Sequence, residues 1–221
     1  MKRILSVDDH GIISIGLENI AQKLGDGAIV GSARESREMF RLLREEKWDL
    51  VVLDISLGGK SGLEVLKDIK HYYPNLPVLI FSLHTGIEFV RRSLKDGASG
   101  YISKDKSEED LIEAINSVLS GGHYISEEHR DELIFSPKGA DHTGLSGREF
   151  EVLVKIGEGK TVREIAADLG ISENTVDTYR SRVKEKMNLK RDAELIRYCI
   201  GAGLVSADIP YVEEEPPESD R

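Results

Sequence analysis

The chain has 221 residues, which is more than one typical small domain and suits two. Its hydrophobic fraction of 39% allows a packed core, and no apolar run reaches the roughly 20 residues that a membrane-spanning helix needs. The net charge of −10 is unevenly distributed, because residues 178–191 hold six basic side chains and one acidic one. The single cysteine, Cys199, excludes an internal disulfide and a cysteine-based zinc site, so we expect a reduced, cytoplasmic location.

Short apolar runs alternate with amphipathic stretches through the first part of the chain. Five strand–helix units in strict alternation predict an α/β fold, a doubly wound parallel sheet of five strands with helices on both faces. The expected strands are 2–7, 28–33, 50–53, 78–81 and 100–102, and the expected helices are 11–24, 35–46, 62–72, 86–95 and 108–119.

Composition divides the chain into four parts. Residues 1–122 form the α/β domain, and the polar, acidic segment 123–143 is expected to be a linker with a helical stretch near 127–135. Residues 144–205 are expected to form a small all-α domain of four helices. Residues 206–221 carry six acidic groups and one basic group and are expected to be a disordered tail.

Capping residues predict where the four helices of the second domain begin. A serine or threonine followed by glutamate three residues later is a capping box, and Gly170 breaks the second helix. The predicted caps are Ser146 with Glu149, Thr161 with Glu164, Ser172, and Asp192.

Polar side chains follow four of the five predicted strands. Asp8 and Asp9 end the first strand, Asp54 the third and Ser82 the fourth, and Lys104 follows the fifth. Ligands of a doubly wound sheet bind outside these strand ends, so the side chains are expected to share one crevice. Singly, each has a commoner explanation, such as a helix cap, a turn or a solvated lysine; their joint register favours a site.

The residue types of this crevice suit transfer of a phosphoryl group to a carboxylate. Clustered carboxylates repel one another, and a bound Mg²⁺ with oxygen ligands offsets that repulsion. Asp54, on the central strand, is the candidate nucleophile for an aspartyl phosphate. Lys104 and the Ser82 hydroxyl then contact phosphoryl oxygens, and the backbone carbonyl of Ser56 completes the metal shell.

These residues resemble the receiver domain of response regulators, which has a flavodoxin-like fold. The matching pieces are VDDH at 7–10, VVLDISLGGKSGLE at 51–64, Ser82, and GYISK at 100–104. The resemblance implies that Asp54 is the phosphoacceptor and that Asp8 and Asp9 are metal ligands. It also implies that Ser82 and Tyr101 are a switch pair and that Lys104 senses the phosphate.

One departure from the family keeps an alternative open. Similar domains usually have proline four residues after the phosphoacceptor, where this chain has Gly58, which loosens the loop beside the site. A receiver that acts as an interaction module without phosphorylation is therefore a second reading. A phosphohydrolase is a third and weaker one, because many such enzymes need aspartate where Ser56 stands.

The second domain contains a helix-turn-helix pattern. Gly170 allows a sharp turn, Ala166 lets two helices approach, and Val176 packs the second helix onto the first. One face of that helix is expected to reach base edges through Asn174, Asp177, Thr178 and Ser181, with Arg180, Arg182 and Lys184 reaching phosphates. The alternative to DNA binding is a basic helix whose charged face is simply solvated.

The second domain resembles the LuxR-type DNA-binding domain in LSGREFEVL at 145–153, EIAADLGISENTV at 164–176 and AELIRYCIGAGLV at 193–205. With the receiver, the whole resembles a NarL/FixJ-type response regulator. The resemblance implies a transcription regulator rather than an enzyme, with a sensor histidine kinase and double-stranded DNA as partners, and a homodimer when phosphorylated. Relatives commonly have lysine in place of Asp177, so the target sequence is expected to differ.

The acidic tail lies outside this resemblance. Its charge is opposite to that of the basic helix, so one hypothesis is that residues 206–221 compete with DNA for that helix.

Overall fold

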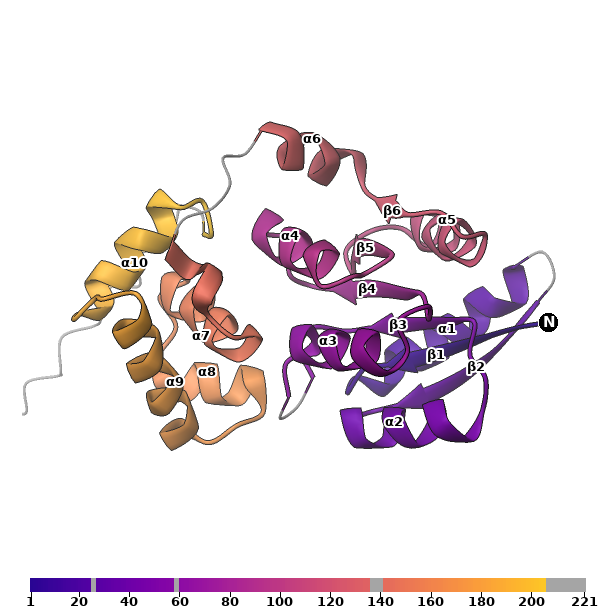
Figure 1. Ribbon diagram of the computed structural model, residues 1–221, viewed down its shortest axis with the longest axis horizontal. Coiled ribbons are helices and arrows are strands. Elements are labelled where there is room, and N and C mark those ends of the chain that lie inside the picture. The colour runs from indigo at the N-terminus through magenta and orange to yellow at the C-terminus, as the bar shows by residue number, and fades with distance from the viewer. Residues whose placement is uncertain (25–26, 58–59, 136–140, 206–221) are drawn as a thin grey trace, which may run out of the picture.

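The computed structural model describes residues 1–24, 27–57, 60–135 and 141–205. A parallel sheet with the strand order β2-β1-β3-β4-β5-β6 forms the first half (Figure 1). Its strands are β1 (Lys2–Val7), β2 (Ala28–Ala33), β3 (Leu50–Leu53), β4 (Val78–Ser82), β5 (Gly100–Ser103) and β6 (Tyr124–Ile125). The helices of this half are α1 (Gly11–Lys23), α2 (Ser36–Glu45), α3 (Gly62–Tyr72), α4 (Ile87–Lys95), α5 (Glu108–Leu119) and α6 (Glu127–Phe135).

Two apolar cores lie on opposite faces of the sheet, because side chains alternate along each strand. In β3, Val51 and Leu53 pack with α2, α3 and α4, whereas Leu50 and Val52 pack with α1 and α5. All four are at most 2% exposed. The doubly wound α/β fold expected from the sequence is confirmed, and it places the carboxyl ends of the strands at one edge.

The sheet contains one strand more than the sequence indicated. β6 pairs in parallel with β5, in the segment that we expected to be a linker. Gly100 allows the close approach, since a Cβ atom there would lie 2.8 Å from the carbonyl oxygen of Tyr124. A strand of two residues shows no alternation of apolar and polar side chains, so its sequence carries no signal.

The second half consists of helices α7 (Gly147–Gly157), α8 (Val162–Leu169), α9 (Glu173–Lys186) and α10 (Asp192–Gly201), preceded by a short 3₁₀ turn at Asp141–Gly144. The expected four helices are thus present. Gly170 adopts a left-handed conformation with φ of 61° between α8 and α9, as a helix-ending glycine should. Among the described helices, none is long and apolar enough to cross a membrane.

Three of the four predicted caps are confirmed, and one is wrong. Ser146, Thr161 and Ser172 each accept a hydrogen bond from a backbone amide of the helix they precede. Asp192 is instead the first residue of α10, and Arg191 precedes it. The Asp192 carboxylate is engaged by Arg180 and Lys184 of α9, so it ties two helices together instead of capping one.

Gly62 shows how tightly α3 approaches the end of β3. A Cβ atom at Gly62 would lie 2.1 Å from the carbonyl oxygen of Asp54 and 2.5 Å from the Cα of Ile55. We predict that Gly62→Ala lowers the free energy of unfolding by about 2–3 kcal/mol, because backbone must move. Gly16→Ala in α1 is the matched control: nothing lies within 4 Å of its Cβ position. We expect it to raise the free energy of unfolding by about 0.5–1 kcal/mol in the same urea titration.

Candidate functional site

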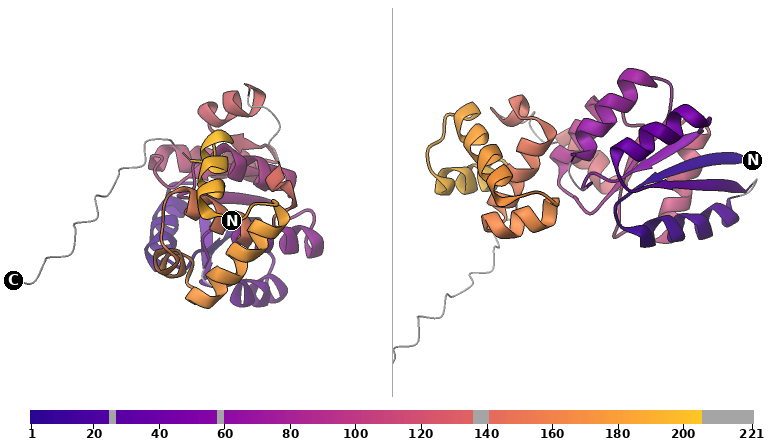
Figure 2. Two further views of the ribbon diagram at one scale, coloured as in Figure 1. Left: turned by 90° about the vertical axis from the view of Figure 1, so that its left-hand side faces the viewer. Right: turned by 90° about the horizontal axis from the view of Figure 1, so that it is seen from below.

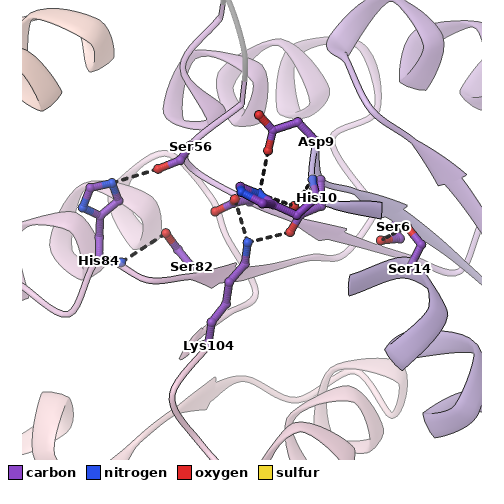
Figure 3. Close-up of polar contacts among 10 residues, drawn as sticks. Ser6, Asp9, His10, Ser14, Ser56, Ser82, His84 and Lys104 are labelled. Carbon is purple, nitrogen blue, oxygen red and sulfur yellow. Dashed lines mark hydrogen bonds and ion pairs between the residues drawn. The ribbon is translucent and has the colours of Figure 1, made fainter. Parts of the chain in front are cut away.

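A buried lysine joins two carboxylates at the carboxyl edge of the sheet. The Nζ of Lys104 lies 2.7 Å from Oδ2 of Asp54 and 2.6 Å from Oδ2 of Asp8. The side chains of Lys104, Asp54 and Asp8 are 7%, 2% and 3% exposed, respectively. Figure 3 shows the Lys104 side chain extending from the segment after β5 to the dashed lines that mark these two contacts. Residues from three strand ends that the sequence placed in one crevice are therefore in direct contact.

The charge balance of this pocket is incomplete. Burial raises the pKa of Asp8, and the neighbouring charge of Asp54 raises it further, although Lys104 opposes both effects. Burial lowers the pKa of Lys104, but Asp54 and Asp8 together outweigh it, so that this pKa lies above its ordinary value. Oδ1 of Asp54 is buried and has no hydrogen-bond partner among the described residues. The pocket thus presents a free acceptor in an acidic, partly dry environment.

Asp9 and His10 lie close to the two buried carboxylates. Ligand atoms of Asp8, Asp9, His10 and Asp54 all lie within 4.8 Å of one another. Nδ1 of His10 is 2.9 Å from Oδ1 of Asp9 and 3.3 Å from Oδ1 of Asp8. Sequence reasoning gave His10 no role, although it directly follows the aspartate pair. The cluster has the oxygen donors that a divalent cation takes.

Three polar side chains hold the loop after β4 through His84: those of Ser56, Ser82 and Tyr101. Ser82 is fully buried, and its Oγ accepts from the backbone amide of His84 at 3.3 Å. Oγ of Ser56 lies 3.1 Å from Nε2 of His84, as Figure 3 shows. The Tyr101 hydroxyl donates to the carbonyl oxygen of His84 at 2.5 Å, and its ring is 0% exposed. Tyr101 is therefore turned inward in this structure.

His84 is the residue that sequence reasoning missed here, since a lone histidine carries no pattern. Burial lowers its pKa to about 4, with Lys155 contributing, so the imidazole is neutral at pH 7. Its ring stacks on Phe89 of α4 at 4.2 Å between centroids. Phe89 in turn lies 4.8 Å from Phe150 of α7. A continuous row of rings thus runs from the acidic pocket to the helical half.

A buried ion pair forms a second connection between the halves. Arg148 of α7 donates to the carbonyl oxygen of Leu57, in the loop after Asp54, at 2.9 Å, and binds Glu151 at 2.5 Å. Glu151 also accepts a hydrogen bond from Ser61, the N-cap of α3. Burial raises the pKa of Glu151, and Arg148 opposes that rise. Arg148 and Glu151 are 1% and 0% exposed, so the ion pair is sealed between the halves.

Arg92 of α4 makes the third connection. Its guanidinium lies over the ring of Phe150, 3.9 Å from the centroid. It donates to the carbonyl oxygens of Leu145, at 3.2 Å, and of His142. These contacts place the start of α7 against α4, the helix that follows Ser82 (Figure 2). The described interface therefore uses α7, not the helix α9.

Helix α9 has one buried and one exposed face, as its sequence predicted. Val176 and Val183 are 0% exposed and pack on α7 and α8. The predicted base-reading side chains all lie on the exposed face: Asn174, Asp177, Thr178 and Ser181. The helix-turn-helix arrangement places these four side chains where a duplex can approach.

The cations of α9 are not equally free. Arg180 binds Asp192 and lies 3.3 Å from Asp177, and Nζ of Lys184 lies 2.7 Å from Asp192. Arg182 is exposed and has no ion pair within the described residues. Of the three predicted phosphate contacts, Arg182 alone is thus available without breaking an intramolecular pair.

We predict that Lys104→Met lowers the free energy of unfolding at pH 7 by roughly 3 kcal/mol, because two buried carboxylates lose their cation. The pKa of Asp8 rises further, and the loss shrinks as the pH falls through that raised pKa, since protonation removes the uncompensated charge. Urea unfolding and ¹³C NMR titration of Asp8 measure the two effects. Lys106→Met, whose partner Glu128 is exposed, is the control, with an expected change of about 0.5 kcal/mol or less. A lower Asp8 pKa in Lys104→Met would contradict this account.

Two family models match the two halves of the chain. Residues 4–116 match the response regulator receiver domain, and residues 143–199 match the bacterial regulatory proteins of the luxR family. The transcriptional activator protein ExaE of Pseudomonas putida is 36% identical over 208 residues, which cover 91% of this chain and 97% of that relative.

Other relatives match this chain along nearly their whole length. Response regulator UvrY of Escherichia coli strain K12 is 30% identical, over 94% of this chain and 98% of its own length. The structure of RcsB from Salmonella enterica serovar Typhimurium, bound to a promoter with a phosphomimetic, has a TM-score of 0.61 at 24% identity. It covers 89% of this chain and 97% of that chain, and shows likeness of fold. The chain therefore belongs to the NarL/FixJ-type response regulators, transcription regulators in which a receiver domain precedes a LuxR-type helix-turn-helix domain.

Proposed function

We propose that a partner histidine kinase phosphorylates Asp54 and that this modification controls sequence-specific DNA binding by α9, in the cytoplasm. The observation that carries this proposal is the contact of Lys104 with Asp54 at 2.7 Å in a pocket that is otherwise acidic and buried. A cation held beside a carboxylate is suited to a phosphoryl group that arrives on that carboxylate. The domains are proposed to span 1–122 and 144–205, with 123–143 as a connecting segment.

The described residues fit Mg²⁺. The partnerless, buried Oδ1 of Asp54 and the carboxylates of Asp8 and Asp9 offer oxygen ligands at one place. We assign the backbone carbonyl of Ser56 as the remaining protein ligand. When bound, Mg²⁺ neutralises charge on the transferring phosphoryl group. The fit rests on the donor chemistry of these residues and on the unsatisfied acceptor.

The roles of the remaining residues follow from their positions. A carboxylate oxygen of Asp54 forms the new O–P bond as the P–N bond of the donor phosphohistidine breaks. The Lys104 ammonium leaves the Asp54 carboxylate and donates to a phosphoryl oxygen, while it keeps its contact with Asp8. The Ser82 hydroxyl turns to donate to another phosphoryl oxygen, which ends its contact with the amide of His84.

This rearrangement reaches the DNA-binding half through two described routes. Movement of His84 disturbs Tyr101 and the row of rings that ends at Phe150. Movement of the loop after Asp54 shifts Leu57, which accepts from Arg148. Because α9 is already exposed, we propose that phosphorylation frees α7 from the receiver and permits a homodimer to present two α9 helices to DNA half-sites.

The exposed face of α9 is proposed to read base edges through Asn174, Asp177, Thr178 and Ser181. Asp177 accepts from Arg180 in the free protein and, with DNA, from a cytosine amino group. Arg182 contacts phosphate directly, whereas Arg180 and Lys184 contact it only after exchanging Asp192 for a phosphate oxygen.

The decisive test is the intact mass of the protein after incubation with acetyl phosphate and Mg²⁺. We expect one phosphoryl adduct, absent in Asp54→Asn and absent when Mg²⁺ is chelated. Asp105→Asn, in the turn after Lys104, is the control and keeps the adduct. An adduct that persists in Asp54→Asn contradicts the assignment. No adduct, with acetyl phosphate or with a phosphorylated kinase, favours the phosphorylation-independent alternative that Gly58 suggested; Gly58 itself lies outside the described residues.

The interface makes a separate prediction. Arg92→Ala removes two hydrogen bonds and the contact with the Phe150 ring, so we expect the domains to separate without phosphorylation. Small-angle X-ray scattering should show a larger radius of gyration, and DNA affinity without phosphodonor should rise by roughly fivefold or more, as about 1–2 kcal/mol of interface is lost.

Arg91→Ala is the matched control for this prediction. Arg91 also pairs with Glu88, at 3.2 Å, but has no described hydrogen bond or ion pair with residues 141–205. If the two variants have the same radius of gyration and the same DNA affinity, the described interface does not limit DNA binding.

A further inference from the structure

Three exposed cations of α9 and of the turn that follows it have no carboxylate partner among the described residues. Arg182 lies in α9, and Lys190 and Arg191 follow in the turn before α10; all three are exposed, and none has an ion pair within the described residues. By contrast, Lys186 binds Glu149 at 2.6 Å, and Arg180 and Lys184 share Asp192. We call Arg182, Lys190 and Arg191 the open cations.

The rest of the described molecule does not cover this surface. Helix α9 packs on α7 and α8, whereas the described contacts of the receiver are with α7, with His142 and Leu145 before it, and with Leu204 after α10. In Figure 1, α7 and α8 stand between α9 and the sheet. An anionic segment can therefore reach the open cations without displacing the receiver.

The chain itself contains such a segment. Residues 206–221 carry six carboxylates and one arginine, and follow directly after Val205. Helix α10 has 10 residues, so it spans only about 15 Å between the turn that holds Arg191 and the region of Val205. A chain of this length extends to roughly 50 Å, so reach does not limit contact between the tail and the open cations.

We propose that residues 206–221 dock on the open cations and compete there with DNA phosphates. The proposal rests on the proposed DNA contacts of α9, and it adds a partner for that surface. Tethering gives the tail an effective concentration on the order of millimolar, so weak carboxylate–guanidinium contacts suffice. DNA must displace the tail, and its binding then releases fewer net counterions than binding to an uncovered surface.

A rival surface exists on the receiver. Arg37 and Arg44 of α2 are likewise cationic and unpaired within the described residues, but α2 interleaves them with Glu38 and Glu45. Residues 178–194, which include the open cations, carry six basic and three acidic side chains, whereas residues 35–46 carry three basic and four acidic ones. Charge complementarity therefore favours the open cations, and the α2 arginines serve as the matched control.

The first test measures binding of the full-length protein to a random DNA duplex as a function of salt. A protein whose six tail carboxylates are neutralised should bind DNA roughly three- to tenfold more tightly at about 50 mM salt, with a steeper salt dependence, and its affinity should converge with that of the wild type at high salt. The substitutions are Asp208→Asn, Glu213→Gln, Glu214→Gln, Glu215→Gln, Glu218→Gln and Asp220→Asn. If the plots of DNA affinity against salt concentration coincide for the variant and the wild type, the proposal is overturned.

Cation variants separate docking from general repulsion of DNA by the tail. In a background of Arg182→Ala, Lys190→Ala and Arg191→Ala, docking predicts that tail neutralisation changes affinity by less than about twofold. In a background of Arg37→Ala and Arg44→Ala, neutralising the tail should keep its full effect on DNA affinity. An undiminished tail effect in the first background means simple repulsion and overturns the proposal.

The second test observes docking without DNA. A spin label on Ser219→Cys should broaden amide signals of α9 and of residues 188–191, and high salt should abolish the effect. Cys199 does not take the label, because it is 0% exposed and burial raises its pKa to about 12. Broadening confined to α2, or spread evenly over the molecule, overturns the proposal.

Two further outcomes of this test are informative. A mixed sample combines isotope-labelled protein that carries no spin label with protein that carries the spin label on its tail. Broadening of amide signals in this sample places the tail on a second copy, and the intramolecular proposal is then wrong. If no variant binds any DNA while the salt-sensitive broadening persists, the tail docks as proposed, and it is the DNA-binding function that fails.

Discussion

The structure depends on one buried cation shared by two carboxylates. Lys104 touches Asp8 and Asp54 at the edge where the parallel strands end, and each of these side chains is nearly inaccessible to water. Burying three charges is tolerable only while they remain paired, and one carboxylate oxygen of Asp54 still has no partner. A phosphoryl group on Asp54 would draw the Lys104 ammonium away from the Asp54 carboxylate. Phosphorylation would therefore change the charge pairing within the pocket.

The contacts around the pocket explain why such a change need not stay local. His84 is hydrogen-bonded by Tyr101 on one side and stacked on Phe89 on the other, and Phe89 packs on Phe150. Arg148 donates a hydrogen bond to the carbonyl oxygen of Leu57, in the loop after Asp54. Close-packed interfaces of this kind switch between discrete arrangements more readily than they deform. The interface meets α7, so in the proposed mechanism phosphorylation changes the placement of the whole helical half while α9 stays exposed.

Much of the fold follows from local sequence patterns. Strand–helix alternation predicted the doubly wound sheet, and the boxes at Ser146 and Thr161 predicted two helix starts that the structure has. Strand β6 and the role of Asp192 were missed for different reasons. Two residues hold no periodicity, and the partner of Asp192 is another helix, which no local pattern reveals.

For the site, the sequence by itself determined which groups are present and at which strand ends: Asp8, Asp54 and Lys104 needed only the topology of a parallel sheet to meet. Their contacts with the rest of the molecule depend on how distant elements pack and could not be inferred from local patterns. His84 accepts from Tyr101, 17 residues away in the chain, and Arg148 donates to Leu57, 91 residues away. Periodicity and motif spacing describe one element at a time, whereas stacking, burial and shared hydrogen bonds exist only where elements meet.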